Sequence, residues 1–170
     1  MSFNSIPEFS FPLINNRDPD TIKALKNALT THGFFTITDH GIDDDLLSAS
    51  YSMSKKFFEL EESTKNTYAH PEMGGARGYT PFGKETALGE TTPDMKEFWH
   101  HGPVTDDSFD ARITSNINVA ELPEFNSQFD GLFNDLNLLG MKVLSAIAVI
   151  LHKEPNFFDD WVSKGNSLLR

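Results

Sequence analysis

The histidines are the first residues whose chemistry needs examination: His32, His40, His70, His100, His101 and His152. A non-haem iron site needs two histidines and one carboxylate on one face, with open positions for oxygen. His70-Pro71-Glu72 places a histidine and a carboxylate two residues apart, and His101 or His152 would supply the third ligand. Pro71 separates the pair and no strand pattern surrounds it, which favours a structural or surface role for His70 and Glu72.

The sequence around the other histidines does not indicate a metal site either. If the segment around His100 and His101 is a strand, the two rings point to opposite faces and cannot share one ion. His40 precedes Gly41, which favours a hydrogen bond from the turn backbone over a ligand role. The sequence therefore predicts no metal ligands and no bound cofactor on this chain.

Arg77 lies in the glycine-rich segment Gly74-Gly75-Ala76-Arg77-Gly78. The segment lacks the strand, the helix and the Lys-Ser/Thr pair of a phosphate-binding loop. A guanidinium among glycines, followed by Tyr79, suits a bidentate clamp on a carboxylate. A solvated loop arginine is the alternative, and the residues alone leave both open.

Carboxylates elsewhere do not reveal an acid–base pair. A catalytic pair needs two titratable groups in contrasting environments. No such contrast marks the four nearby carboxylates, Glu85, Glu90, Asp94 and Glu97. No catalytic residue is predicted, and Phe98-Trp99 is interpreted as core rather than pocket wall.

The first part of the chain predicts two helices around a short strand. Asp18 caps a helix that starts at Pro19 and ends before Gly33, and a strand follows over 34–38. Carboxylates at 43–45 suit the start of the second helix, because they meet the positive end of its dipole. Its expected buried stripe is Leu47, Tyr51, Ser54 and Phe58. Residues 61–68 predict another short helical piece.

The second part predicts a long loop, a strand and a long helix. Glycines and prolines make 70–93 an irregular excursion, and 95–101 has the pattern of a strand. The longest helix starts near Pro123, and its last half, 143–151, is apolar on nearly every face, which predicts deep burial. Pro155 opens a further short helix rich in aromatic residues.

Composition narrows the function classes. The chain has 170 residues, 25 acidic and 14 basic, with a formal net charge of −11. The absence of cysteine excludes disulfides, thiolate metal sites and thiol catalysis. The acidic balance argues against nucleic acid or an anionic membrane as partner. The start of the chain lacks a basic, apolar secretory signal, and no strictly apolar run is long enough to span a bilayer, so we expect a cytoplasmic protein.

Several ordered segments resemble one family. The stretch from His32 to Ile42, HGFFTITDHGI, resembles the "GFF…HGI" segment of isopenicillin N synthase-like oxygenases. Phe57-Phe58-Glu59-Leu60 with the acidic piece after it, Arg77-Gly78-Tyr79 and Lys96-Glu97-Phe98-Trp99 are similar to the family's following elements, in the same order. Asn166 to Arg170 looks like the start of the strand leading towards the catalytic barrel.

The resemblance implies an Fe(II)- and 2-oxoglutarate-dependent oxygenase that acts on a small molecule. It implies an α+β fold, namely the mainly helical N-terminal region of a double-stranded β-helix (jelly-roll) enzyme. Residues 1–165 would form that region, and 166–170 would begin the catalytic domain. Oxidative decarboxylation of 2-oxoglutarate to succinate would drive hydroxylation, desaturation or ring closure of the substrate.

The catalytic motifs of the family are missing from this sequence. The family holds iron with His-x-Asp and a distant histidine, and binds 2-oxoglutarate with Arg-x-Ser, and neither short motif occurs here. We therefore expect a truncated chain, inactive alone, whose C-terminal catalytic domain is absent. By resemblance, Arg77 and Tyr79 would contact the substrate near the pocket mouth. Arg170 would approach the 2-oxoglutarate pocket, with a direct role disfavoured, and His40 would be structural.

Two alternatives stay open. The first is a stand-alone acidic helical binding module without catalysis. Its uncovered apolar surface, 143–151 with Phe157, Phe158 and Trp161, would favour self-association. The second is a compact hydrolase or metal enzyme that uses His70, Glu72 and His101.

Overall fold

The computed structural model describes residues 5–170. Residues 1–4 lie outside the described residues. They are the first residues of the predicted N-terminal region, and of the start of the chain that we interpret as lacking a secretory signal. The chain divides into two compact units. One comprises the residues up to Ile42 together with Leu136–Ser163, and the other comprises Asp43–Asp135 together with Lys164–Arg170.

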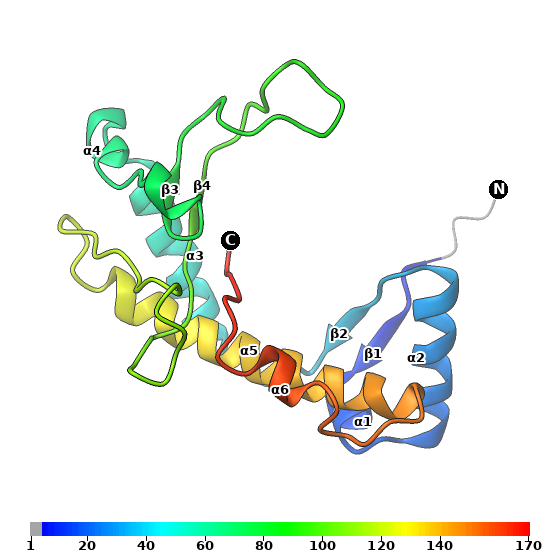
Figure 1. Ribbon diagram of the computed structural model, residues 1–170. Helices are drawn as coiled ribbons and strands as arrows, with labels where there is room; N and C mark the ends of the chain where they lie inside the picture. The colour runs from blue at the N-terminus through cyan, green and yellow to red at the C-terminus, as the bar shows by residue number, and fades with distance from the viewer. Residues whose placement is uncertain (1–4) are drawn as a thin grey trace. The chain divides into compact units, whose positions relative to one another are not determined.

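The first unit is built on two short parallel strands. β1 (Glu8–Ser10) pairs with β2 (Thr36–Thr38) so that Phe9 lies opposite Ile37. The connection between them contains α1 (Phe11–Asn15) and α2 (Pro19–Thr31), and α2 lies beside the strand pair (Figure 1). Its core consists of Ile14, Leu25, Ala146 and Ile150, with the partly buried Phe9, Ile22, Leu29, Phe35 and Ile37 packed against them.

Helix α2 confirms the start predicted from its sequence. The Asp18 carboxylate accepts hydrogen bonds from the Thr21 backbone N–H at 2.9 Å and the Thr21 hydroxyl at 2.8 Å. Pro19 occupies the first helical turn, where its missing N–H leaves no bond unmade. The helix ends at Thr31 with His32 as its C-cap, and Gly33 follows with φ +79°. Local sequence signals therefore set where this helix begins and ends, while Leu25 in the core stabilises it.

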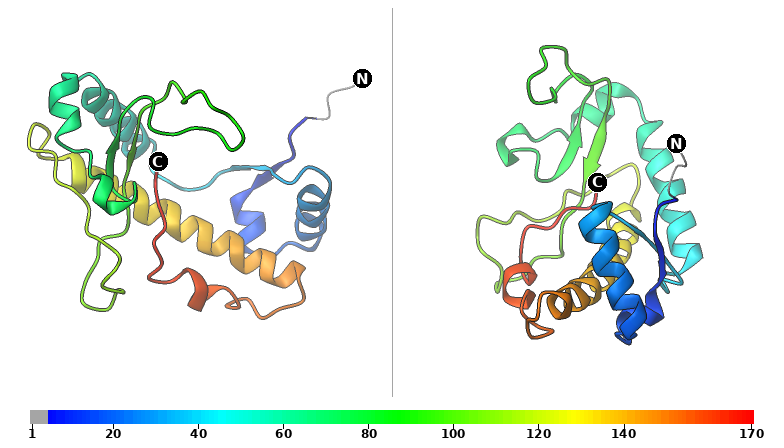
Figure 2. Two further views of the ribbon diagram at one scale, coloured as in Figure 1. Left: turned by 45° about the horizontal axis from the view of Figure 1, so that its top comes forward. Right: turned by 90° about the vertical axis from the view of Figure 1, so that its right-hand side faces the viewer.

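The second unit contains the remaining short elements and the glycine-rich segment. Its elements before the long helix are α3 (Asp44–Phe58), α4 (Glu62–Asn66), the 3₁₀ turn η1 (Pro71–Met73), β3 (Gly78–Thr80) and β4 (Phe98–His100). β3 and β4 pair in antiparallel fashion, with Tyr79 opposite Trp99. The chain between them, 81–97, makes one long excursion from this strand pair and back (Figure 2). The end of the chain also joins the pair, because His101 and Leu169 exchange backbone hydrogen bonds of 2.9 and 2.8 Å.

An aromatic cluster forms the core of the second unit. Phe57 is fully buried, with its ring centroid 4.8 Å from that of Trp99 and 5.4 Å from that of Phe125. Tyr68 and Tyr79 contact the same ring at about 6 Å in tilted or edge-on geometry, which suits the quadrupoles of aromatic rings. This cluster links α3, the strand pair and the start of the long helix, and it confirms Trp99 as a core residue.

The long helix α5 (Phe125–Ile150) contributes to both units, through residues up to Asp135 in one and from Leu136 in the other. Phe125, Phe129, Leu132 and Phe133 are buried, as are Ala146, Ala148 and Ile150. The deep burial expected for 143–151 is wrong, because Val143, Leu144, Ile147 and Val149 are only half-buried and Leu151 is 53% exposed. One helical face packs in the core, and the other apolar faces are left partly open.

By length and composition, α5 would also suffice to cross a membrane, and it alone does so among residues 5–170. This is weak evidence, because the core helix of a soluble protein meets the same criterion. Phe125 near its start and Ala146 near its end both lie in packed cores. Those buried contacts favour a core role for α5.

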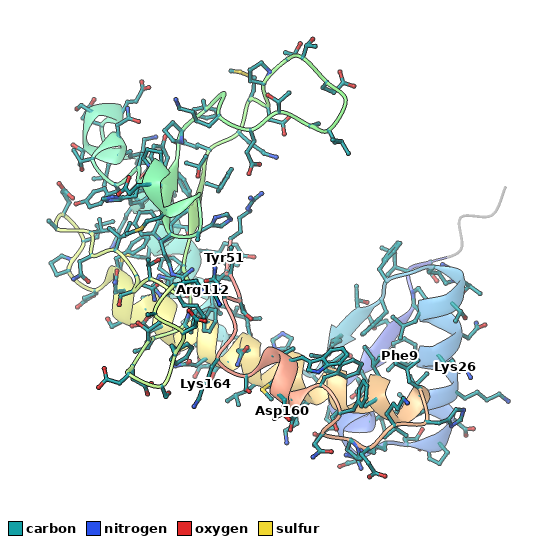
Figure 3. The ribbon with its side chains drawn as sticks, in the orientation of Figure 1. Phe9, Lys26, Tyr51, Arg112, Asp160 and Lys164 are labelled. Carbon is teal, nitrogen blue, oxygen red and sulfur yellow. The ribbon has the colours of Figure 1, made fainter. Side chains whose placement is uncertain are left out.

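Two further expectations need correction. Helix α3 buries Ser50, Met53 and Phe57, one residue before the predicted stripe, and Tyr51 is 78% exposed (Figure 3). The aromatic cluster selects Phe57 rather than Phe58, and this choice rotates the helix. The segment 70–93 also contains β3, which the glycines beside it concealed from the sequence pattern.

The α+β class is confirmed, with two two-stranded sheets within residues 5–170. No closed barrel is present in that range. The jelly-roll part of the expected fold and the boundary between 165 and 166 stay predictions.

Gly78 lies where a side chain cannot fit, which gives a stability prediction. Its φ is +79°, and a Cβ would come within 2.5 Å of the Tyr68 carbonyl oxygen and 2.7 Å of Ile117 Cδ1. We expect Gly78→Ala to lower the free energy of unfolding by about 3 kcal/mol, from backbone strain plus overpacking. Urea unfolding of the purified variant measures this.

Gly89 provides the matched control, because its φ is +87° but nothing lies within 4 Å of its Cβ position. Gly89→Ala should lower the free energy of unfolding by only about 1 kcal/mol, the strain contribution alone. Equal losses in the two variants would contradict the close approach at Gly78.

Candidate functional site

Arg77 is buried just before β3, with only 1% of its surface exposed. The alternative of a solvated loop arginine is therefore wrong. Its Nη1 donates to the Ala76 carbonyl at 2.6 Å, while Nε and Nη2 have no hydrogen-bond partner among the described residues. Burial lowers the pKa of the guanidinium, but arginine still keeps its proton in proteins. The structure thus holds a buried positive charge with two unused donors.

Gly102 lies against the guanidinium of Arg77. A Cβ at this glycine would lie 2.1 Å from Arg77 Cζ, 2.2 Å from Nη2 and 2.6 Å from Nε. Because the central carbon is the nearest of the three, Gly102 covers the face of the group and leaves its edge free. The Asn116 side chain fixes this glycine, accepting from the Gly102 N–H at 2.7 Å and donating to its carbonyl at 2.9 Å.

His101 adjoins this glycine and is also 1% exposed. Its Nε2 lies 2.7 Å from a carboxylate oxygen of Asp130 on α5 and 3.0 Å from the Asn116 amide nitrogen. We assign the ring proton to Nε2, because the carboxylate accepts there, so Nδ1 carries a lone pair with no partner among the described residues. Burial lowers the pKa of His101 and the charge of Arg77 adds to this, while Asp130 opposes it. The imidazole is therefore kept neutral at pH 7.

His100 points to the other face of the strand, as the alternation of a strand requires. Its Nδ1 donates to the Gly75 carbonyl, and its Nε2 accepts from Arg170 Nε at 2.7 Å. Arg170 also lies over the Phe98 ring, 3.9 Å from its centroid, and donates to Glu85 at 3.1 Å. Arg170 is thus engaged by three groups of its own unit, and its predicted approach to 2-oxoglutarate stays a prediction.

Tyr79 belongs to a buried ion-pair network. Its hydroxyl donates to the Glu97 carboxylate, which also pairs with Lys65 Nζ at 2.8 Å. Burial, and next the hydrogen bond to Glu97, raise the pKa of Tyr79, so the hydroxyl stays a neutral donor. Tyr79 is 3% exposed, so this chain does not place it at an open mouth. Its predicted contact with substrate is untested.

The proposed histidine–carboxylate metal site does not assemble. His70 Nδ1 and Glu72 form a pair at 2.8 Å, partly exposed, whereas His101 is held by Asp130. Within residues 5–170 no three His, Asp or Glu side chains are arranged to hold an ion. The residues present therefore do not fit an iron site. His40 has the predicted structural role, since its Nδ1 accepts from the Ile42 N–H at 3.1 Å.

Sequence reasoning missed the partners of this site. Asp130 stands between Phe129 and Gly131, and a lone carboxylate beside a buried helical stripe is a signal that calls for a buried partner. Asn116 lies in a polar connection where nothing distinguishes it from solvated neighbours. The role of Gly102 depends on the approach of Arg77, which no local pattern contains.

The Lys65–Glu97 pair gives a second stability prediction. The two side chains are 9% and 16% exposed, so Glu97→Ala leaves a buried ammonium without a counter-ion. We expect a loss of about 3 kcal/mol in the free energy of unfolding, measured by urea denaturation. The surface pair Lys55–Glu59, 75% and 64% exposed, is the matched control. Glu59→Ala should change the free energy of unfolding by less than about 0.5 kcal/mol.

A double variant separates the lost pair from lost packing. Lys65→Met with Glu97→Leu removes both charges and should recover stability relative to Glu97→Ala alone. A Glu97→Ala variant as stable as Glu59→Ala would contradict the buried ion pair.

Comparison with known proteins places the chain in a family. Residues 6–121 match the family model described as the N-terminal region of non-haem dioxygenases, "non-haem dioxygenase in morphine synthesis N-terminal". A 2-oxoglutarate-dependent dioxygenase of Didymella fabae is 28% identical over 152 residues, which cover 84% of this chain and 46% of the relative. The chain thus spans about half the length of the curated relatives that it matches.

Solved structures of oxygenases have a similar fold over most of this chain. A 2OG-Fe(II) oxygenase family protein from Caulobacter crescentus is 37% identical with a TM-score of 0.79, over 98% of this chain and 55% of that one. A full-length Neurospora crassa protein, crystallised in complex with alpha-KG, is 26% identical with a TM-score of 0.77, again over 98% and 55%. The chain therefore belongs to the isopenicillin N synthase-like family of Fe(II)- and 2-oxoglutarate-dependent oxygenases, and it corresponds to their N-terminal region.

Proposed function

We propose that this chain is the N-terminal part of a 2-oxoglutarate-dependent oxygenase that oxidises a small-molecule substrate. The match to the N-terminal dioxygenase model over residues 6–121 carries the proposal. In the proposed reaction, dioxygen supplies one oxygen atom to 2-oxoglutarate, which becomes succinate and carbon dioxide. The other atom hydroxylates a C–H bond of the substrate, or leaves as water in a desaturation or ring closure.

Iron chemistry is proposed for the longer protein and not for this chain. The described residues bring no three ligands together, so no step of the reaction is assigned to them. Relatives about twice as long as this chain are consistent with a catalytic half outside it. We propose that the 170-residue chain alone is inactive and that its catalytic partner is a C-terminal domain.

The contribution of this chain would be on the substrate side. Arg77 and Tyr79 are our proposed contact residues, and the two unused donors of Arg77 support that role for it. The Tyr79 hydroxyl donates to Glu97, so the support for Tyr79 as a contact is its place two residues after Arg77. Arg170 is proposed to link the end of the chain to β4, through His100 and Phe98.

The alternative of a stand-alone binding module is not favoured, because the match to oxygenases covers most of the chain. The isolated chain nevertheless has the exposed apolar surface on which that alternative was based. Phe157 and Trp161, 37% and 72% exposed, form an aromatic group with Phe158 at the start of α6 (Asp159–Val162), which contains Trp161. We propose that this surface, with the open faces of α5, favours self-association when the chain is made alone in the cytoplasm.

Succinate release tests the proposed function. The product of the complete gene and the 170-residue chain are each incubated with Fe(II), 2-oxoglutarate and ascorbate, and succinate is quantified. We expect succinate from the longer protein and none above the protein-free control from the chain. Release by the chain alone would contradict the placement of the metal centre outside it. A longer protein that binds 2-oxoglutarate without producing succinate, with or without candidate substrates, would overturn the oxygenase proposal.

A further inference from the structure

His101 is a buried imidazole between a positive and a negative side chain. It follows the last residue of β4 and is 1% exposed, with its ring centroid 5.9 Å from that of Phe129. Asp130 on α5 accepts from its Nε2 at 2.7 Å, and the buried Arg77 guanidinium is the other charge that acts on it. The Asn116 amide, 3.0 Å from Nε2, is neutral. The ring therefore lies in an apolar setting with one charge of each sign.

A second proton on this ring would find no acceptor. Nδ1 carries the lone pair of the neutral ring and has no hydrogen-bond partner among residues 5–170. Protonation would make it a buried donor on an imidazolium that shares its surroundings with the Arg77 cation. Asp130 supplies one negative charge, but its side chain is 30% exposed, so water weakens the attraction. The cluster would then hold two buried cations and one partly solvated carboxylate.

The shift of the His101 pKa agrees with this geometry. Burial lowers the pKa below its ordinary value of 6.5, Asp130 opposes the shift, and the Arg77 charge adds to it. As pH falls, an opened chain therefore binds the proton first, because its histidine keeps the ordinary pKa. The stabilisation of the closed form is complete above a pH of about 6.5. It is lost progressively below that value, down to the lowered pKa of the closed form.

The backbone of residues 101–102 is bonded to two other segments of the second unit. The His101 N–H donates to the Leu169 carbonyl at 2.9 Å, and the Leu169 N–H donates back at 2.8 Å. Gly102 exchanges two hydrogen bonds with the Asn116 side chain. Gly102 also lies directly against Arg77, because a Cβ there would come within 2.1 Å of Cζ. A charged His101 cannot move away from Arg77 without straining the bonds to Leu169 and Asn116.

We propose that His101 is a pH-dependent conformational switch. The neutral ring, bonded to Asp130, keeps the segment around Leu169 paired with the end of β4. The protonated ring, repelled by Arg77, opens this pairing, while the aromatic cluster of the second unit stays packed. The switch uses only residues of this chain and does not depend on the proposed oxygenase activity.

Amide hydrogen exchange tests the switch. Protection factors of the His101 and Leu169 amides are measured in the 170-residue chain between pH 8 and pH 5. The Tyr79 amide, which donates to the Tyr68 carbonyl at 3.0 Å, is the internal reference in the same unit. We expect protection of His101 and Leu169 to fall up to about tenfold per pH unit below 6.5, with Tyr79 unchanged. Protection independent of pH, or an equal fall at all three amides, would overturn the proposal.

His101→Gln removes the titrating group, with circular dichroism as the check on folding. Glutamine keeps a side-chain N–H for Asp130 but gains no proton, so the pH dependence of the Leu169 amide should disappear. His152→Gln, at an exposed histidine, is the matched control and should keep the wild-type dependence. Persistence of the dependence in folded His101→Gln would overturn the switch, as would its loss in His152→Gln.

His100 is the competing source of acid sensitivity. It lies on the opposite face of the strand pair, where its Nε2 accepts from Arg170 at 2.7 Å. His100→Gln should leave the pH dependence of the Leu169 amide in place. Its disappearance in folded His100→Gln would overturn the assignment to His101.

A titration of the wild-type chain decides the matter if a variant fails to fold. The imidazole nitrogens of His101 are followed by ¹H–¹⁵N NMR across the same pH range. We expect Nδ1 to stay unprotonated at pH 6.5 and to gain its proton only at lower pH, together with the loss of protection at Leu169. Protonation of Nδ1 at or above pH 6.5, or without any change at Leu169, would overturn the proposal.

Discussion

The antiparallel pairing of β3 with β4 places Tyr79 opposite Trp99. That register decides which side chains of the second unit lie on each face of the strand pair. Side chains alternate between the two faces of a strand, so the odd-numbered residues of β3, β4 and their flanks share one face of the pair. That face contains the aromatic contacts to Phe57 and the polar site, through Arg77, Tyr79, Glu97, Trp99 and His101. The opposite face receives His100 and Phe98 with Arg170. A slip of one residue would exchange the two sets.

Two buried cations of the second unit, Lys65 and Arg77, have different electrostatic environments. Lys65 has a carboxylate at 2.8 Å and a cation–π contact with the Tyr79 ring, which accounts for its burial. Arg77 is even more deeply buried and has no counter-ion among residues 5–170. The first arrangement stabilises the unit as it stands. The second leaves two buried donors, Nε and Nη2, without a hydrogen-bond partner among the described residues.

Much of the fold follows from local sequence, and most of the site does not. The Asp18-Pro19 start of α2 and the carboxylates at the start of α3 are local signals, and the structure confirms both. The stripe of α3 was predicted one residue late, because the choice between Phe57 and Phe58 depends on Trp99 and Phe125, far away in sequence. The partners of Arg77 and His101 depend on the same kind of long-range contact.

We propose that this chain is the N-terminal part of a longer oxygenase whose iron ligands lie outside the described residues. The most direct test is the intact mass of the protein made from its own gene in its native cell. We expect a mass about twice that of the chain, because the chain covers 46% of one relative and 55% of another. A native mass near 19.1 kDa, the mass of these 170 residues, would contradict it.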